Sequence, residues 1–327
     1  MKRLLVLAVA ATAILANAQT FPGTKPVTLV VPFAAGGPTD RVARDLAEAM
    51  RKALPGSNFV VENVNGAGGT IGAAKVARAA PDGHTLLLHH IGMAAAPGLY
   101  RKLPYKVLED FEFLGMINEV PMTIIGKPQL PANNYRDLEN YIRTNSGKLN
   151  IAHAGLGSAS HLCGLMWQAA INAKEPMTTI PFGGTAPAMN ALVGGQVDMM
   201  CDQTTNTTGQ IEAGRVKAYA VTTSKPLSSN KLLKDYPTLQ EMGLKGFDLT
   251  IWHGLYAPKG TPPAVLTQLN NTLKLALKDA DFIKKEEGLG AVVITDRRVE
   301  PAAHKAFVAA EINKLKPVID AAGKYAD

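Results

Sequence analysis

Four segments rich in glycine and small hydroxyl residues hold the groups best suited to binding chemistry. They read Ala-Ala-Gly-Gly-Pro-Thr-Asp (34–40), Asn-Val-Asn-Gly-Ala-Gly-Gly-Thr (63–70), Gly-Leu-Gly-Ser-Ala-Ser-His (155–161) and Phe-Gly-Gly-Thr-Ala-Pro (182–187). Each follows an apolar run and precedes a helical pattern. Glycine lets a ligand approach the backbone closely, and the first N–H groups of a helix lack intrahelical partners. Such helix starts bind anions without any lysine or arginine.

The segment 34–40 has the composition of a helix start. Pro38 suits the first helical position, where a missing N–H costs nothing, and Asp40 suits the first turn, beside the positive end of the helix dipole. Gly36 and Gly37 leave backbone N–H groups open to a ligand. The same residues also make an ordinary cap with a tight turn. An anion site and a plain helix start therefore both remain open at this point.

The segment 63–70 invites comparison with a dinucleotide-binding fingerprint. The pattern G-x-G-x-x-G counted from Gly66 requires a glycine where Ile71 stands, and the acid found about 20 residues later, Asp82, lies in a turn instead of following a strand. We therefore reject a nucleotide site here. We expect tight backbone at the edge of a cleft.

The serines of 155–161 raise a hydrolase alternative, in which Ser158 or Ser160 works with His161 and Asp202. The nucleophile pattern G-x-S-x-G fails around both serines, because neither has glycine two residues away on each side. A serine three residues before a histidine at a helix start is more economically an N-cap. We expect the Ser158 hydroxyl and the neighbouring N–H groups to bind an oxygen-rich ligand.

The remaining candidates follow predicted strands. Thr185 would present its hydroxyl and free N–H groups beside the Ser158 loop. Asp202 points toward the same rim, or else caps the segment 204–213. His90 contacts a ligand or serves as a structural histidine. Neither H-E-x-x-H nor Cys-x-x-Cys occurs and the histidines are dispersed, so we expect no metal site and no cofactor.

The first eighteen residues predict an export signal that is removed from the mature protein. Lys2 and Arg3 form a basic start, residues 4–15 an apolar core too short to span a membrane, and residues 16–18 (Ala-Asn-Ala) a small-x-small cleavage pattern. Cleavage after Ala18 leaves 309 residues (327 − 18), enough for two domains. The expected location is the periplasm.

Charge and cysteine content narrow the choice of partners. Loss of Lys2 and Arg3 leaves 32 basic residues (34 − 2) against 27 acidic ones, a net charge of +5. The charges are scattered and no Lys/Arg cluster carries interleaved aromatic residues, so nucleic acid is not an expected partner. Cys163 and Cys201 would meet an oxidising compartment, where they pair or remain two separate buried residues. Their spacing leaves both possibilities open.

Strand and helix patterns alternate along the chain, which implies parallel sheets covered by helices on both faces. Strands are predicted at residues 27–33, 59–64, 85–89, 149–152, 178–182, 198–202, 218–222, 249–257 and 291–295. Helices are predicted at residues 42–54, 71–80, 135–144, 162–169, 189–193, 262–278 and 300–319.

The restart of this pattern in mid-chain predicts two lobes. Lobe 1 comprises residues 19–121 plus 250–327, and lobe 2 comprises residues 122–249. The chain would then cross between the lobes twice, near Val120–Ile125 and near Gly246–Trp252. Two crossings make a hinge, which is what closure around a ligand needs.

Seven motifs, in order and nearly end to end, resemble those of the Bug-type (Bordetella uptake gene) extracytoplasmic solute receptors, the binding components of tripartite tricarboxylate transporters. They are Pro32–Asp40, Glu62–Gly69, Pro81–Leu87, Gly157–Leu162, Pro181–Ala188, Gly195–Asp202 and Trp252–Pro262.

The resemblance implies an α/β periplasmic-binding-protein fold (type II-like): two lobes, each with a central mostly parallel sheet flanked by helices, joined by a two-crossing hinge. One ligand carboxylate would rest on the 35–39 loop through backbone groups and bridging waters. The other end would meet Ser158 and Thr185, with Asp202 helping through water. The implied ligand-binding residues are Phe33, Ala35, Gly36, Gly37, Pro38, Thr39, His90, Gly157, Ser158, Ala159, Thr185 and Asp202.

Two departures from the family pattern bear on the ligand. Asn65 replaces a common proline, and Gly183 replaces a frequent basic residue beside the second subsite. An aromatic carboxylate and a dicarboxylate of four to six carbons both fit what remains. The expected protein is a monomeric, non-enzymatic receptor whose partners are a small organic carboxylate and membrane transporter subunits. The alternatives are a secreted serine esterase and a binding protein that serves a membrane signalling sensor.

Overall fold

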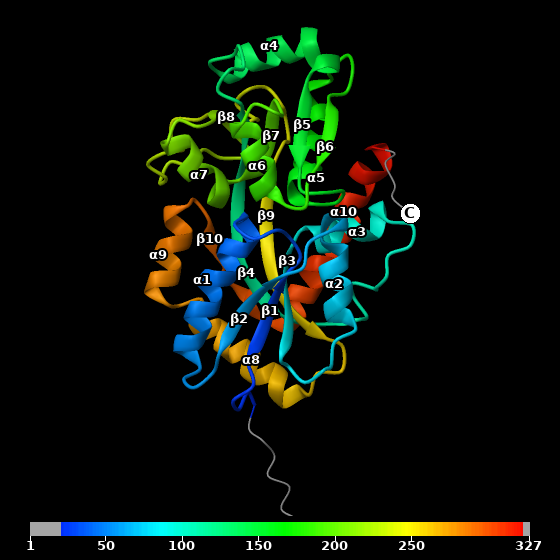
Figure 1. Cartoon of the computed structure of the whole chain (residues 1–327), viewed down its shortest axis with the longest axis vertical. Helices are drawn as coiled ribbons and strands as arrows, with labels where there is room; N and C mark the ends of the chain where they lie inside the picture. The colour runs from blue at the N-terminus through cyan, green and yellow to red at the C-terminus, as the bar shows by residue number, and fades with distance from the viewer. Residues whose placement is uncertain (1–20, 323–327) are drawn as a thin grey trace, which may run out of the picture.

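The computed structural model describes residues 21–322, so the predicted export signal and its cleavage site lie outside the described residues. Ten strands form one hydrogen-bonded sheet whose main path runs β2-β1-β3-β9-β4-β7-β5-β6, with β8 and β10 pairing with β4. Figure 1 shows an elongated molecule with two groups of elements stacked along its long axis. We name them the β1 region and the β5 region.

The β1 region is built from both ends of the chain. Its strands are β1 (Val27–Val31), β2 (Phe59–Asn63), β3 (Thr85–His90), β9 (Thr250–Pro258) and β10 (Val292–Val293). Its helices are α1 (Pro38–Ala53), α2 (Thr70–Ala77), α3 (Gly92–Leu99), α8 (Pro263–Ala276), α9 (Ala280–Gly288) and α10 (Pro301–Ala322).

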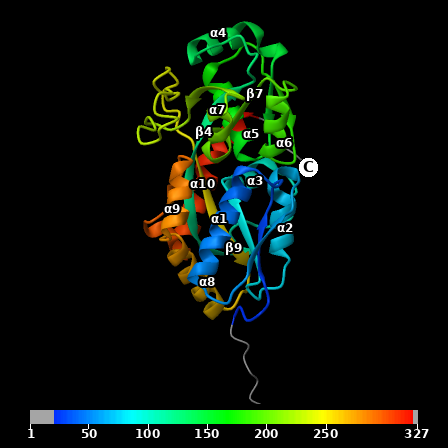
Figure 2. The same cartoon turned by 60° about the vertical axis from the view of Figure 1, so that its left-hand side comes forward.

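The β5 region is built from the middle of the chain. Its strands are β5 (Asn150–His153), β6 (Thr178–Pro181), β7 (Met199–Gln203) and β8 (Lys217–Val221). Its helices are α4 (Tyr135–Asn145), α5 (Ala159–Ile171), α6 (Thr185–Val193) and α7 (Thr204–Glu212). In Figures 1 and 2 the helices α5, α6 and α7 lie above α1, α2 and α3.

The long strand β4 (Phe111–Gly126) joins the two regions. It pairs with β9 as far as Pro121↔Thr250, and from Met122 onward it pairs with β7 and β8. No strand was predicted here from the sequence, only a crossing between the lobes near Val120–Ile125. Glycine and proline are uncommon within a central strand. The structure accommodates Gly115 at a shift of the β4–β9 register, and Pro121 at the point where β4 changes partners.

The expectation of mostly parallel sheets needs correction in the middle of the molecule. The three strands β2, β1 and β3 are parallel to one another, as are β7, β5 and β6. However, β9 runs antiparallel to both β3 and β4, and β4 runs antiparallel to β7. The reason is that β9 returns from the β5 region toward the β1 region while β4 runs the opposite way. The lobe boundaries at 121/122 and 249/250 stay a prediction.

Some short helices also escaped the sequence analysis. Helix α3 is rich in alanine and glycine and contains Pro97, and helix α9 is polar with a glycine at its end, so neither has a clear apolar periodicity.

Within residues 21–322 no helix combines the length and the apolar character needed to cross a membrane. Within the same range no group of acidic, histidine or cysteine side chains is arranged to hold a metal ion.

A disulfide and a buried aromatic pair stabilise the core of the β5 region. Cys163 on α5 bonds to Cys201 on β7, with the two Cα atoms 6.0 Å apart, which settles the pairing that the spacing left open. Fully buried Trp167 donates its indole N–H to the Tyr135 hydroxyl over 2.9 Å. These contacts fix α5, whose first turn faces the β1 region, against both the sheet and α4.

Removal of the disulfide should lower the free energy of unfolding without changing the fold. The bond closes a loop with a sequence separation of 38 residues, and a constraint of this size on the unfolded chain typically contributes about 2–4 kcal/mol. The double variant Cys163→Ala/Cys201→Ala should lose that amount in urea unfolding followed by circular dichroism. The reduced wild type is the control. A variant as stable as the oxidised wild type would contradict this role.

Candidate ligand-binding site

A small polar pocket lies between the two regions, where several strand-to-helix loops meet. It is lined by Phe33, Gly37, Pro38, Thr39, His90, Ala154, Ser158, Ala159, Ser160, Thr185 and Gln203. The structure thus brings eight predicted site residues together from both halves of the chain: Phe33, Gly37, Pro38, Thr39, His90, Ser158, Ala159 and Thr185.

Three helices begin at this pocket. Helix α1 starts at Pro38 with Gly37 as N-cap, α5 starts after the N-cap Ser158, and α6 starts after the N-cap Gly184. The first N–H groups of each helix have no intrahelical partner and lie at the positive end of the helix dipole. No lysine or arginine is among the lining residues just named. The pocket therefore offers an anion or an oxygen-rich group backbone amides in place of a cationic side chain.

Gly36, although predicted, is not among the residues that line the pocket, and its N–H already has a partner. It donates to Asp40 Oδ2 over 2.9 Å, and the same carboxylate accepts two hydrogen bonds from Arg44 and one from Asn63. Burial alone would raise the pKa of Asp40, but these hydrogen bonds hold it below its ordinary value. Asp40 is therefore the anion that shapes the loop before α1. Ala35 and Gly157 likewise lie outside the lining residues.

His90 is buried, and burial lowers its pKa to about 3, so its ring is neutral. Its Nδ1 accepts the Gly92 N–H over 2.9 Å, which places the single ring proton on Nε2 and makes that nitrogen a donor. The Phe33 ring stacks on the imidazole at 4.6 Å. A neutral histidine with a fixed tautomer can donate to a ligand oxygen without bringing a charge.

The serines of the α5 loop act as helix caps and polar lining. Ser158 Oγ accepts the backbone N–H of His161 over 3.3 Å and lies 3.2 Å from Ser160 Oγ. Ser160 Oγ in turn accepts the Ala154 N–H. The contact between Ser158 and His161 is thus a cap to the backbone, as expected, and its geometry differs from the hydroxyl–imidazole contact of a serine hydrolase.

At the end of β7, Gln203 lines the pocket in place of the predicted Asp202. Asp202 is fully buried behind it. Successive side chains of a strand face opposite sides, so only one of the two could face the cleft, and the sequence does not show which. Asp202 Oδ2 accepts the Asn206 amide, and Oδ1 has no hydrogen-bond partner among the residues the structure describes.

Burial raises the pKa of Asp202 to about 7, against smaller opposing contributions from Asn206, the Gln203 N–H and the Thr185 hydroxyl. A protonated Asp202 does not repel an anion in the pocket beside it. This matters because three helix ends supply only partial positive charges, which a nearby ionised carboxylate would offset.

The pocket is closed in this structure. Its free space is about 10 Å³, roughly that of one water molecule. Two hydrogen bonds join the two regions: the Ala34 N–H donates to Gly183 O over 3.1 Å, and the Tyr100 hydroxyl lies 2.9 Å from Leu156 O. A ligand larger than water can enter only if these contacts between the two regions open.

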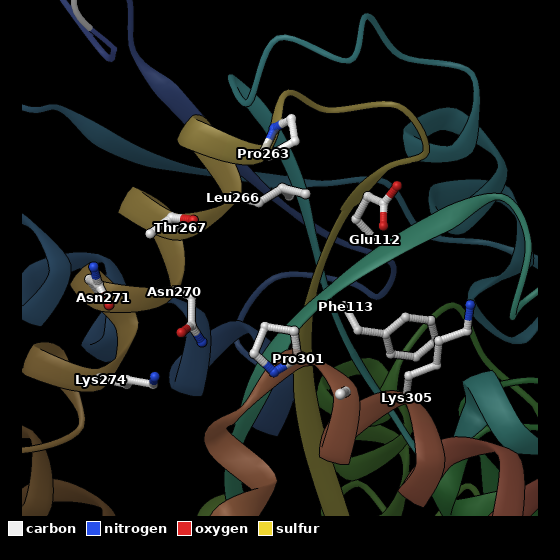
Figure 3. A pocket seen from close by; sticks show the side chains of 11 residues that line it. Glu112, Phe113, Pro263, Leu266, Thr267, Asn270, Asn271, Lys274, Pro301 and Lys305 are labelled. Atoms are coloured by element: carbon white, nitrogen blue, oxygen red, sulfur yellow. The ribbon is translucent and has the colours of Figure 1, made fainter.

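A larger cavity of about 510 Å³ lies elsewhere, between β4, α8 and α10 (Figure 3). Its two lysines already have partners: Lys274 pairs with Glu300 at 2.8 Å, and Lys305 lies 5.8 Å from the centre of the Phe113 ring. All its walls belong to the β1 region and the segment of β4 beside it. Closure of one region on the other could not enclose a ligand there, so we place the site in the smaller pocket.

The fold and the inter-region pocket define a periplasmic binding protein, and solved structures of such proteins match most of the chain. BugD, a periplasmic binding protein, is 49% identical with a TM-score of 0.88, covering 92% of this chain and 99% of its own. MatC from Rhodopseudomonas palustris, solved with malate, is 40% identical with a TM-score of 0.84 and covers 90% and 98%. An R. palustris protein solved with adipate is 32% identical with a TM-score of 0.86 and covers 93% and 98%.

The family model described as "Tripartite tricarboxylate transporter family receptor" matches residues 42–324. The chain belongs to this family of solute-binding receptors. This confirms the resemblance inferred from the seven motifs and sets the esterase alternative aside, since the family is one of receptors and not of enzymes.

The raised pKa of Asp202 predicts a pH dependence of stability. Between its ordinary pKa of 3.8 and about 7 the folded protein holds a proton that the unfolded chain releases, so the free energy of unfolding should fall as pH rises through this window. From about pH 5 to pH 8, Asp202→Asn should lose less stability than wild type, by on the order of 1–4 kcal/mol. Urea unfolding measures this difference. Asp235→Asn, at an exposed position, should follow the wild type. Equal losses in Asp202→Asn and wild type would contradict a proton held on Asp202.

Proposed function

We propose that this protein captures a small dicarboxylate in the periplasm and delivers it to a tripartite tricarboxylate-type membrane transporter. The observation that carries the proposal is the convergence of three helix N-termini on one enclosed pocket without a cationic side chain. Malate and adipate, bound by two related proteins, are both dicarboxylates. We favour this class over an aromatic carboxylate for that reason.

The polar groups around the pocket suffice for useful affinity. The donors are backbone N–H groups at the helix starts, His90 Nε2 and the hydroxyl of Ser158. Each hydrogen bond to a carboxylate contributes about 1.5–3 kcal/mol. Four or five such bonds, less the costs of association and ordering, give micromolar binding or better. Exclusion of water on closure strengthens each of them.

Capture would proceed by closure of the two predicted lobes, 19–121 plus 250–327 and 122–249. The strand β4 runs through the junction between them and β9 begins there, so the two would serve as the hinge while the loops before α1, α5 and α6 approach each other. The small free space of the pocket and the hydrogen bonds between the two regions support a closed state in this structure. Capture then requires an open state that closes on the acid.

The proposed location follows from residues 1–18, with cleavage after Ala18, and from relatives that are periplasmic binding proteins. The Cys163–Cys201 disulfide is consistent with an oxidising compartment. A monomeric receptor that carries one acid in its cleft would meet the membrane subunits of the transporter, as its family implies.

Removal of the Ser158 hydroxyl should weaken carboxylate binding. We expect one malate per mature protein by isothermal titration calorimetry, and a Kd about 10–150 times higher for Ser158→Ala, because one hydrogen bond to an ionised group is lost. The substitution also removes the N-cap of α5. Asn134→Ala is the matched control, since Asn134 caps α4 far from the pocket and its loss has a similar cost in stability. Equal weakening in both variants would show a stability effect and not a ligand contact.

Closure itself can be tested with a methyl group. Gly68 has a φ of +61°, and a Cβ there would lie 1.8 Å from Leu156 O in the opposite region. Gly68→Ala should therefore prevent full closure and raise the Kd for malate tenfold or more. Gly56 has a φ of +84° with nothing within 4 Å of a built Cβ, so Gly56→Ala carries a similar backbone cost and should bind normally. Normal binding by Gly68→Ala would argue against closure as proposed.

A further inference from the structure

A chain of four buried polar side chains leads from the pocket into the β1 region. Thr39 Oγ1 lies 3.3 Å from His253 Nε2, and His253 Nδ1 lies 2.8 Å from Asn118 Oδ1. Asn118 Nδ2 donates to Glu286 Oε2 over 2.7 Å. The four residues belong to α1, β9, β4 and α9, and each is at most 2% exposed. Only Thr39 lines the pocket.

The direction of every hydrogen bond in this chain follows from its far end. An ionised Glu286 only accepts, so Asn118 must turn its N–H toward it and its carbonyl oxygen toward His253. His253 is neutral, because burial lowers its pKa well below the ordinary value, and it must place its one proton on Nδ1 to donate to Asn118. His253 Nε2 then carries a lone pair.

Thr39 is consequently left as an acceptor. Its hydroxyl has a single hydrogen, which is used in donating to His253 Nε2. What remains for the pocket is the oxygen lone pairs, which a carboxylate oxygen cannot use. A hydroxyl on the ligand can donate to them. In the same pocket His90 Nε2 is a donor. Thr39 therefore binds a hydrogen-bond donor of the ligand, whereas His90 binds an acceptor.

We propose that the Thr39–His253–Asn118–Glu286 chain makes this receptor select dicarboxylates that carry a hydroxyl over those that do not. This selectivity rests on the proposed carboxylate-binding function. It further specifies that the ligand carries a hydroxyl group between its two acid groups. Thr39 contacts the ligand, whereas His253, Asn118 and Glu286 are positioning residues that act through it. Discrimination arises because a plain acid leaves the Thr39 oxygen buried without a donor.

The charge state of Glu286 limits the pH range of this selectivity. Burial raises the pKa of Glu286 to about 7, and the hydrogen bond from Asn118 opposes that rise. Asp45 on α1 also raises this pKa, whereas Arg41 on α1 and Lys285 on α9 lower it. Once protonated, Glu286 can donate to Asn118, the whole chain can reverse, and Thr39 can turn its hydrogen toward the pocket. Preference for the hydroxylated acid should therefore be larger at about pH 8.5 than at about pH 6.

The test compares malate with succinate, which differ by one hydroxyl, on the mature protein by calorimetry. The wild type should bind malate about fivefold or more tightly than succinate at pH 8.5. Thr39→Val should bring the two affinities to within about twofold, and Thr39→Ser should restore the difference. Glu286→Gln should reduce the ratio of malate affinity to succinate affinity although residue 286 lies outside the pocket. The reason is that an amide can either accept from or donate to Asn118.

Glu311→Gln is the matched control for the remote substitution. Glu311 is also a buried glutamate; it accepts hydrogen bonds from the Trp252 indole and from Lys314, and it is outside the chain. The ratio of malate affinity to succinate affinity in Glu311→Gln should equal that of the wild type. Equal binding of malate and succinate by wild type, or an unchanged ratio in Glu286→Gln, overturns the selectivity chain while carboxylate binding stands. Binding of adipate with no malate binding does the same. If none of the three acids binds, the proposed function itself fails and the selectivity with it.

Discussion

Backbone N–H groups hold an anion firmly only where water is kept out, and much of this structure serves that constraint. The unpaired amides at the starts of α1, α5 and α6 carry partial charges, which bulk water would screen. The two regions therefore meet face to face over the pocket, with Gly68 and Gly184 at the points where backbone of one region touches the other. A side chain at either position would keep the regions apart and leave the amides hydrated.

The same constraint explains the charge states and hydrogen-bond partners of the acidic residues near the pocket. Asp40 is ionised, but Arg44, Asn63 and the Gly36 N–H satisfy it, so it shapes a loop instead of repelling a ligand. Burial favours the protonated form of Asp202, which removes a negative charge from behind Thr185. The pocket is thus made receptive to an anion by neutralising the carboxylates around it, while no lysine or arginine lines the pocket itself.

Sequence reasoning succeeded where local chemistry decides the outcome. Pro38 and Ser158 stand at the helix starts where their residue types placed them, and the strand-to-helix loops meet at one site because parallel strands end at the same edge of a sheet. It failed for β4, which contains Gly115 and Pro121. The structure places Gly115 at a register shift against β9 and Pro121 where β4 changes partner from β9 to β7. It also placed Asp202 at the rim, where Gln203 lies, since a shift of one residue along a strand reverses the face.

The sequence by itself determined the alternating elements, the glycine-rich helix starts and the family, because these are written in neighbouring residues and in the order of short motifs. Tertiary structure alone decided that Cys163 bonds to Cys201 and which of two adjacent residues, Asp202 or Gln203, lines the pocket. It alone brought Thr39 into one hydrogen-bonded chain with residues 118, 253 and 286, which are distant in the sequence and meet only when the sheet forms and excludes water. No local pattern can encode such a contact.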